Sequence, residues 1–219
     1  MFASAQDYKR AHDNDMGPNT GGMGSFSPTP LVSTELEQTI MSTIIVPTVE
    51  GLRKEGISYN GVLFAGLMLT ADGPKLIEYN CRFGDPETQS MITRFEGDLA
   101  ALFLSCAQGK MDRSHLVFNT NVAMCVVMAS RGYPGSFVKN TPIKKLHKAT
   151  DIHGVTVYHA GTMMAGDILL ARGGRVLNIV ATAGSLRQAR MRAYEAIDLI
   201  DWPEGFCRSD IGAKLSSTK

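Results

Sequence analysis

The chain has 219 residues, of which 44% are hydrophobic, enough to form one large domain or two modest ones. Lys and Arg number 22 against 21 Asp and Glu, so the net charge of +1 offers no basic surface for nucleic acid or an anionic membrane. The longest apolar run, VAMCVVMA, is far shorter than the roughly 18 to 20 residues of a membrane helix. The four cysteines form no CxxC pair and no signal peptide is visible, so we predict a reduced, cytoplasmic protein without nucleic-acid or membrane partners.

The first distinctive segment is QDYKRAHDNDMGPNTGGMGSFSP, residues 6–28. It is too long and irregular for a simple connection, and Lys9 and Arg10 add positive charge to it. It matches neither the P-loop nor the G-x-G-x-x-G fingerprint, and the spacing of Asp13 and Asp15 predicts a turn rather than a calcium loop. Backbone N–H groups could converge on an anion at its glycines, Gly17, Gly21, Gly22 and Gly24.

A helix is predicted over residues 33–56, where apolar residues recur at helical intervals. Thr34 and Glu37 are spaced as a capping box at its start, and Gly56 ends it. Pro47 lacks the N–H that a helix interior requires, so a kink is expected there.

A hairpin is predicted next. The runs GVLFAGLMLT and PKLIEYN read as strands, and Asp72-Gly73 between them is a hairpin signal. Two helices are predicted after the hairpin, at residues 87–94 and 98–108. The polar segment at 109–119 has few packing residues, so we expect a domain boundary near residue 115.

Short strands are predicted beyond this boundary, from the runs NVAMCVVMAS, GVTVYHAGT, DILLAR and RVLNIVATA. A last helix is predicted from Ser185, with Gln188 completing a capping box, and the polar tail at 214–219 is expected to fray. Its apolar face consists of Leu186, Ala189, Ala193, Ile197 and Ile200. We therefore predict a small sheet closed by one amphipathic helix.

The run IEYNCRFGDPETQ places polar side chains at every second position before a turn. On a strand, Glu78, Asn80 and Arg82 share one face. Carboxylate and amide oxygens suit Mg²⁺ or Mn²⁺, and Arg82 can form a forked pair with a phosphate or carboxylate. The turn through Asp85 and Pro86 is expected to hold Asp85 close to Arg82. The same spacing also fits a solvated strand face, and the residues alone leave both interpretations open.

Other catalytic groupings have less support. The five histidines form no HxxxH or HxH pair, and no G-x-S-x-G elbow occurs. Cys81 is expected to point away from Glu78 and Asn80 on a regular strand. The sequence therefore predicts no imidazole metal site and no Ser or Cys nucleophile.

Taken together, these motifs resemble the phosphoribosylamine-glycine ligases of purine biosynthesis, members of the ATP-grasp superfamily. The resemblance covers essentially the whole chain and includes RGYPGSF, HAGT, GGRVLNIVATAGSL and RSDIG. The motifs PNTGGMG and RFGDPETQ, in this order, are its most specific part. Tyr8 departs from the usual QDHKR, which puts a proton-transfer role at this position in doubt and leaves Asp7 and Lys9 in place.

The fold that the resemblance implies is α+β. Residues 1–115 would form the C-terminal part of the ATP-grasp domain, an antiparallel sheet with helices. Residues 116–219 would form a small β-rich domain closed by a helix. Family members carry a substrate domain, a phosphate flap and an adenine hinge before QDHKR. The resemblance therefore implies a C-terminal half, and FASAQDYKR is expected to be a strand whose partners lie in the N-terminal half, in cis or in trans.

The activity that the resemblance implies is a two-step ligation. ATP phosphorylates the carboxylate of glycine, and the amine of 5-phosphoribosylamine attacks the glycyl phosphate. Glu78 and Asn80 would hold Mg²⁺ or Mn²⁺, Arg82 would stabilise the transferring charge, and Asp85 would orient Arg82 or receive the substrate ammonium. The substrate-binding residues implied are Asp7, Lys9, Pro18, Asn19, Thr20, Gly21 and Gly22.

Two alternatives stand beside this activity. The chain can be a non-catalytic fragment that retains the fold and weak metal or phosphate binding. A biotin-dependent carboxylase is disfavoured, because in that group the residues after Glu-x-Asn-x-Arg do not resemble RFGDPETQ.

Overall fold

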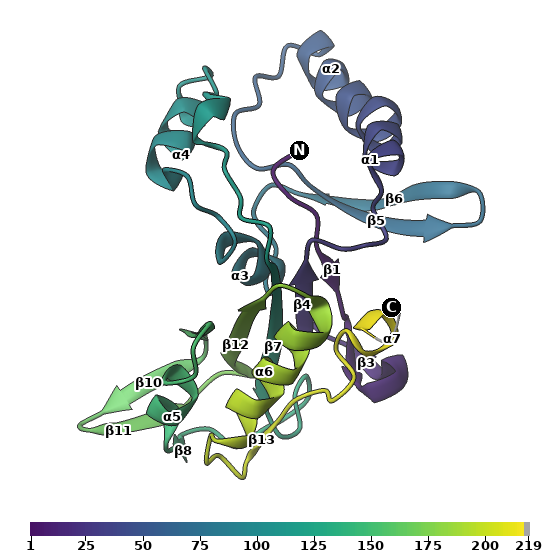
Figure 1. Ribbon diagram of the computed structural model, residues 1–219. Helices are drawn as coiled ribbons and strands as arrows, with labels where there is room; N and C mark the ends of the chain where they lie inside the picture. Colours follow the sequence, from purple (N-terminus) through teal and green to yellow (C-terminus); the bar gives the residue numbers. More distant parts are fainter. Residues whose placement is uncertain (217–219) are drawn as a thin grey trace. The chain divides into compact units, whose positions relative to one another are not determined.

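The computed structural model describes residues 1–216, and its backbone forms two compact units (Figure 1). The first unit comprises Met1–Ser4, Thr29–Gly84 and Phe95–Asn119. The second comprises Ala5–Pro28, Asp85–Arg94 and the chain from Thr120 onward. The two units thus alternate along the sequence. Residue 115 falls inside a segment of the first unit, and the contiguous domains expected on either side of it stay a prediction.

One long helical stretch opens the first unit. It comprises α1 (Thr34–Ile40), a π-helical segment (Met41–Ile45) and α2 (Val46–Lys54). The predicted cap was wrong by one residue, because the Ser33 side chain accepts the hydrogen bond, from Leu36 N at 3.2 Å. The irregularity expected at Pro47 takes the form of the wider π segment directly before it, since proline cannot continue the hydrogen-bond ladder.

The predicted hairpin follows this helix and is confirmed. β5 (Phe64–Thr70) pairs with β6 (Gly73–Asn80) in antiparallel register, with Thr70 opposite Gly73. Gly73 has φ 96°, a conformation that favours glycine. Gly66 lies opposite Glu78 but Leu67 lies opposite Leu76, so one extra residue bulges out of β6.

The rest of the first unit is a small core with α4 (Leu99–Ala107). The Asp98 side chain caps α4 by accepting a hydrogen bond from Ala101 N at 2.9 Å. Phe2 packs its ring against three other phenylalanines, with centroids 5.1 to 5.8 Å apart. Ile40 and Leu102 are the buried large aliphatic residues among those described in this unit.

The second unit is built on an antiparallel sheet with the strand order β1-β4-β7-β12-β9, and β13 also pairs with β7. Its strands are β1 (Gln6–Asp7), β4 (Gly24–Ser27), β7 (Val122–Ser130), β9 (Val155–His159), β12 (Arg175–Ala183) and β13 (Gly205–Phe206). The expectation that FASAQDYKR pairs with a separate half was wrong for β1, because β1 pairs with β4 of the same unit.

Helices cover both faces of this sheet (Figure 1). α6 (Leu186–Asp198) covers one face and is capped by Ser185, whose side chain accepts a hydrogen bond from Gln188 N at 3.3 Å. α3 (Glu87–Ile92) packs against the other face, beside Cys125 and Val180. The predicted apolar face of α6 is confirmed: Leu186 is partly buried and Ala189, Ala193, Ile197 and Ile200 are buried in the main core.

Smaller elements complete the second unit. They are β2 (Arg10–His12), β3 (Met16–Asn19), β8 (Thr141–Ile143), β10 (Thr162–Ala165), β11 (Ile168–Ala171), α5 (Leu146–Thr150) and α7 (Ala213–Ser216). Asp13–Asp15 forms a 3₁₀ turn between β2 and β3, as the turn prediction requires. The tail expected to fray is helical through residue 216, and residues 217–219 lie outside the described part. Within residues 1–216, no helix is long and apolar enough to cross a membrane.

Candidate active site

The predicted metal ligands lie side by side at the end of β6. Asn80 Nδ2 donates a hydrogen bond to Glu78 Oε1 at 3.1 Å, so both side chains occupy the same face of the strand. Gly66 lies opposite Glu78, and a Cβ there would come within 3.2 Å of the Glu78 Cγ. The absence of a side chain at Gly66 therefore leaves room for the stem of Glu78.

This pair suits a hard cation with few protein ligands. Among the described residues, no group of three or more His, Cys, Asp or Glu side chains is placed to hold a metal ion. One carboxylate and one amide would leave most positions of an octahedral Mg²⁺ to water and phosphate oxygens, which is how this ion is commonly bound.

Arg82 and Asp85 belong to different units. Arg82 is exposed in the first unit, and its Nη1 donates to Phe83 O at 3.0 Å. The Asp85 carboxylate, in the second unit, accepts hydrogen bonds from Gln89 Nε2 at 2.9 Å and Arg175 Nη2 at 3.3 Å. The expected pairing of Arg82 with Asp85 thus stays a prediction, while Asp85 has two other partners.

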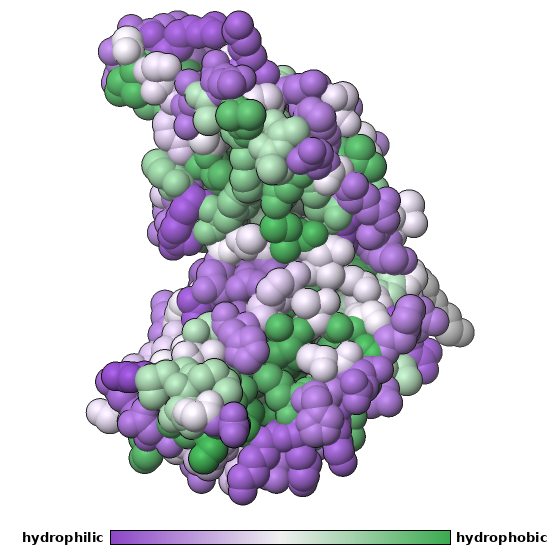
Figure 2. Space-filling model, turned by 90° about the vertical axis from the view of Figure 1, so that its left-hand side faces the viewer, coloured by the Kyte–Doolittle hydropathy of each residue, from purple (hydrophilic) through white to green (hydrophobic). Residues whose placement is uncertain are grey.

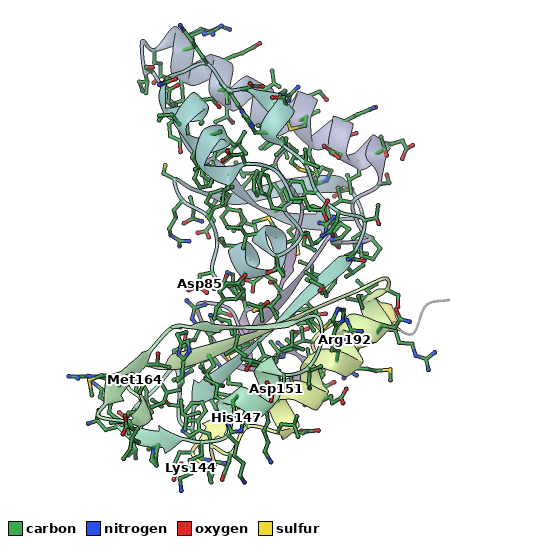
Figure 3. The ribbon with its side chains drawn as sticks, turned by 60° about the vertical axis from the view of Figure 1, so that its left-hand side comes forward. Asp85, Lys144, His147, Asp151, Met164 and Arg192 are labelled. Carbon is green, nitrogen blue, oxygen red and sulfur yellow. The ribbon has the colours of Figure 1, made fainter. Side chains whose placement is uncertain are left out.

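Sheet register places Asp7 under the start of α3. Asp7 lies opposite Ser25, and Ser25 lies opposite Cys125, so all three side chains point to the α3 face. Ser25 Oγ lies 2.8 Å from Pro86 O and 2.9 Å from Ser90 Oγ, which ties α3 to β4. Figure 3 shows Asp85 on this side of the sheet, and His147 and Asp151 on the side of α6.

The glycine-rich loop lies against the same place. Gly22 has φ 123°, and a Cβ there would lie 2.4 Å from Pro86 Cδ and 2.8 Å from Asp7 Oδ1. Thr20 Oγ1 donates to Lys9 O and accepts from Gly22 N, each at 2.9 Å. Only glycine fits at position 22, because it must approach both the Asp85–Pro86 peptide and Asp7.

The expected convergence of loop N–H groups on an anion is not what the structure shows. Gly22 N donates to Thr20, and Gly21 N donates to the Tyr133 hydroxyl at 3.1 Å. Pro18 and Asn19 lie on β3, and Pro18 lines a pocket with His12, Tyr133 and Phe206. Substrate binding by Pro18, Asn19, Thr20, Gly21 and Gly22 remains a prediction.

Arg175 joins these elements, and the sequence alone did not single it out. Its Nη1 donates to Asp85 O at 2.6 Å, and its guanidinium lies so close to Gly21 that a Cβ there would come within 2.8 Å of it. Arg175 is 90 positions from Asp85, and Tyr133 is 112 positions from Gly21, so only the fold brings them together. Both lie within motifs that carry the family resemblance, the one signal that pointed to them.

We name Asp7, Lys9, Asp85, Glu87 and Arg175 the carboxylate cluster. Lys9 Nζ lies 2.6 Å from Asp7 Oδ2, and the Lys9 side chain is half-exposed. Burial raises the pKa of Asp7, and the ion pair with Lys9 opposes this shift. Burial also raises the pKa of Glu87, and the nearby negative charge of Asp7 adds to the effect.

The buried Cys125 thiol lies beneath this cluster. Burial raises its pKa well above the ordinary value, and the charge of Asp85 adds to this shift. A thiol held protonated is a poor nucleophile. Cys125 is therefore poorly suited to act as a nucleophile.

Comparisons with known proteins identify the family of this chain. The family described as phosphoribosylglycinamide synthetase, ATP-grasp (A) domain, matches residues 1–88, and the C domain of the same synthetase matches residues 123–214. Phosphoribosylamine–glycine ligase of Vigna unguiculata is 45% identical over 220 residues, which cover 99% of this chain and 71% of that protein. The chain belongs to the phosphoribosylamine–glycine ligase family.

Other members of this family match nearly the whole chain. The enzyme of Brucella melitensis is 51% identical over 211 residues, covering 96% of this chain and 49% of that protein. The crystal structure of phosphoribosylamine–glycine ligase from Thermotoga maritima has a TM-score of 0.79 at 33% identity, covering 94% of this chain and 50% of that one. The chain spans about half the length of the first curated relatives that it matches.

A wider likeness concerns the fold alone. The biotin carboxylase subunit of pyruvate carboxylase has a TM-score of 0.63 at 13% identity and covers 93% of this chain. The predicted α+β fold of ATP-grasp type, with antiparallel sheets and helices, is therefore confirmed.

Proposed function

We propose that this chain forms part of an ATP-dependent ligase that joins glycine to 5-phosphoribosylamine through a glycyl phosphate. The observation that carries the proposal is the match over 96% of the chain to proteins named phosphoribosylamine–glycine ligase. The carboxylate cluster supports it, because its mixture of positive and negative side chains is suited to a small zwitterion. Glycine, 5-phosphoribosylamine and ATP are the proposed substrates.

In the first unit, Glu78 and Asn80 are the proposed ligands of Mg²⁺ or Mn²⁺. The metal ion, when bound, would neutralise phosphate charge on ATP. Arg82 would bind the carboxylate or the transferring phosphoryl group in a forked hydrogen-bonded pair, and its delocalised charge would stabilise the negative charge that builds up.

In the second unit, the proposed substrate residues act by position and charge. Arg175 and Gln89 hold the Asp85 carboxylate in place, and Lys9 balances the charge of Asp7. The loop Thr20–Gly22 is hydrogen-bonded to Lys9 and Tyr133, so its backbone is fixed against the cluster. Such preorganisation lowers the entropic cost of bringing two substrates together.

The proposed partner is the part of the family enzyme that this chain does not match. Apolar side chains gather on the face of the first unit where α4 lies (Figure 2). Phe103 and Leu104 of α4 are 42% and 60% exposed, a pattern that marks an interaction surface. We keep the cytoplasm as the expected compartment, although the relative from Arabidopsis thaliana is named chloroplastic.

The proposal is tested by measuring ADP release that depends on both glycine and phosphoribosylamine. The chain is assayed alone and together with the half of the Brucella melitensis enzyme that it does not match. We expect turnover only in the combination, because an ATP-grasp site needs closure to exclude water. No turnover by a folded combination would favour the non-catalytic fragment, and full turnover by the chain alone would contradict the proposed partner.

A further inference from the structure

Glu87 is a buried carboxylate whose backbone N–H hydrogen-bonds to it at the start of α3, and whose Oε2 has no partner among the described residues. Its side chain is only 3% exposed. Gln89 Oε1 and Asn178 Oδ1 are also buried without a partner in that part of the chain. All three atoms are acceptors, so this side of the sheet lacks a hydrogen-bond donor.

The cations of the cluster are already engaged elsewhere. Lys9 pairs with Asp7, and Arg175 binds both the carbonyl and the carboxylate of Asp85. Leaving an acceptor buried and unsatisfied is unfavourable, and more so for a charged group. Burial outweighs the hydrogen bond from the Glu87 backbone N–H, so the charged form of Glu87 is incompletely compensated in the folded chain.

We infer that Glu87 binds the ammonium group of the amino-acid substrate, glycine. This inference rests on the proposed function. A primary ammonium brings three N–H donors and a positive charge, which match the unpartnered oxygen and the negative surroundings of Glu87 and Asp7. Asp85 is less suited to this role, because Gln89 and Arg175 already occupy both of its carboxylate oxygens.

The amines of the two substrates, phosphoribosylamine and glycine, differ in the protonation state that the reaction requires. The amine of phosphoribosylamine must be neutral when it attacks, because a protonated nitrogen has no free electron pair. The amine of glycine does not react and can remain protonated. A buried carboxylate favours a protonated amine, so Glu87 suits glycine and would hinder the nucleophile.

The test is Glu87→Gln in the chain combined with the matching half of the Brucella melitensis enzyme. The amide keeps the size of the side chain and removes its charge. We expect the KM for glycine to rise about tenfold or more, since hydrogen bonds to charged groups contribute about 1.5 to 3 kcal/mol. The KM for phosphoribosylamine should stay unchanged. Inhibition by glycolate, which has a hydroxyl in place of the ammonium, should change much less than the KM for glycine.

Thermal unfolding of the chain distinguishes binding from a structural role. Burial raises the pKa of Glu87 in the folded state, so its ionisation reduces stability as pH rises through that pKa. Glu87→Gln should therefore leave Tm at neutral pH equal or raised. Glu195→Gln is the matched control, because it makes the same change at an exposed position of α6.

Each result decides the inference. An active wild-type enzyme whose Glu87→Gln variant keeps its KM for glycine would overturn it, as would a rise confined to the KM for phosphoribosylamine. A lowered Tm would assign Glu87 a structural role instead. A wild-type enzyme without glycine-dependent turnover would overturn the proposed function together with this inference.

Discussion

At the scale of single residues, Arg208 shows how a buried cation is accommodated. Its side chain is fully buried, yet it lies 2.7 Å from Asp210 and 3.0 Å from Asp15 and donates to Arg10 O at 3.1 Å. The guanidinium also lies over the ring of Tyr8, 5.0 Å from its centroid. These contacts join the first strands of the second unit to its last segment.

The same contacts explain the departure at Tyr8. Its ring packs into the core on the α6 side, with Phe26, and its hydroxyl accepts a hydrogen bond from Gly212 N at 2.9 Å. Asp7 points to the opposite face of the sheet. The Tyr8 side chain therefore packs on the opposite face from the carboxylate cluster, and only the Tyr8 backbone N–H contacts the cluster, by donating to Asp7 Oδ1 at 2.7 Å.

Asp210→Asn tests the Arg208 network. Burial alone would raise the pKa of Asp210, but hydrogen bonds from Arg208 outweigh it and lower the pKa to about 2. A depressed folded pKa means that stabilisation is complete above the unfolded pKa and disappears as pH falls toward about 2. We expect the variant to lose about 2 kcal/mol at neutral pH and progressively less below about pH 5.

Urea unfolding across this pH range measures the difference between the two proteins. Asp167→Asn, which changes an exposed carboxylate in a turn, is the control. A constant difference between Asp210→Asn and the wild type from neutral pH to the acid end would contradict the assignment. The sequence predicted only a turn at Asp13 and Asp15, because Arg208 lies 193 positions from Asp15.

At the scale of secondary-structure elements, local chemistry was predictable and long-range pairing was not. Asp72-Gly73 specifies a tight turn, and Ser185 and Asp98 act as N-caps, so the hairpin, α6 and α4 follow from neighbouring residues. β1 has two residues and β4 has four, too short for a periodic pattern. β1 pairs with β4, and β4 in turn pairs with β7, about 100 positions further on.

Glu78→Ala tests the metal site on β6. The side chain is exposed, so the fold should remain intact, while the one charged oxygen ligand is lost. In the combined enzyme, we expect the Mg²⁺ concentration for half-maximal turnover to rise about tenfold or more. Asp72→Asn, at the turn of the same hairpin, should leave it unchanged. An unaltered Mg²⁺ dependence in Glu78→Ala would remove Glu78 from the ligands.

At the scale of the whole molecule, the two units differ in how completely their apolar side chains are buried. The second unit contains the main core, with Met124, Val126 and Ile179 fully buried between the sheet and α6. In the first unit, Met68 and Ile77 of the hairpin are 55% and 63% exposed. Local patterns predicted most of these elements, but they could not predict that Asp85–Arg94 belongs to one unit and its flanking segments to the other.

This difference predicts unequal local stability. A two-stranded hairpin is marginally stable unless it packs against something, and β5 and β6 pair only with each other within the described residues. By hydrogen exchange, we expect the amides of β5 and β6 to exchange about tenfold or more faster than those of β7 and β12, whose opening requires disruption of the core. Adding the half of the Brucella melitensis enzyme that this chain does not match should slow exchange in β5, β6 and α4. Exchange in β7 and β12 should stay the same, because that sheet is already covered on both faces. Equal protection of the two units in the isolated chain would contradict the predicted difference in local stability. No slowing on addition would show that the exposed apolar side chains of the first unit are not the surface that the partner covers.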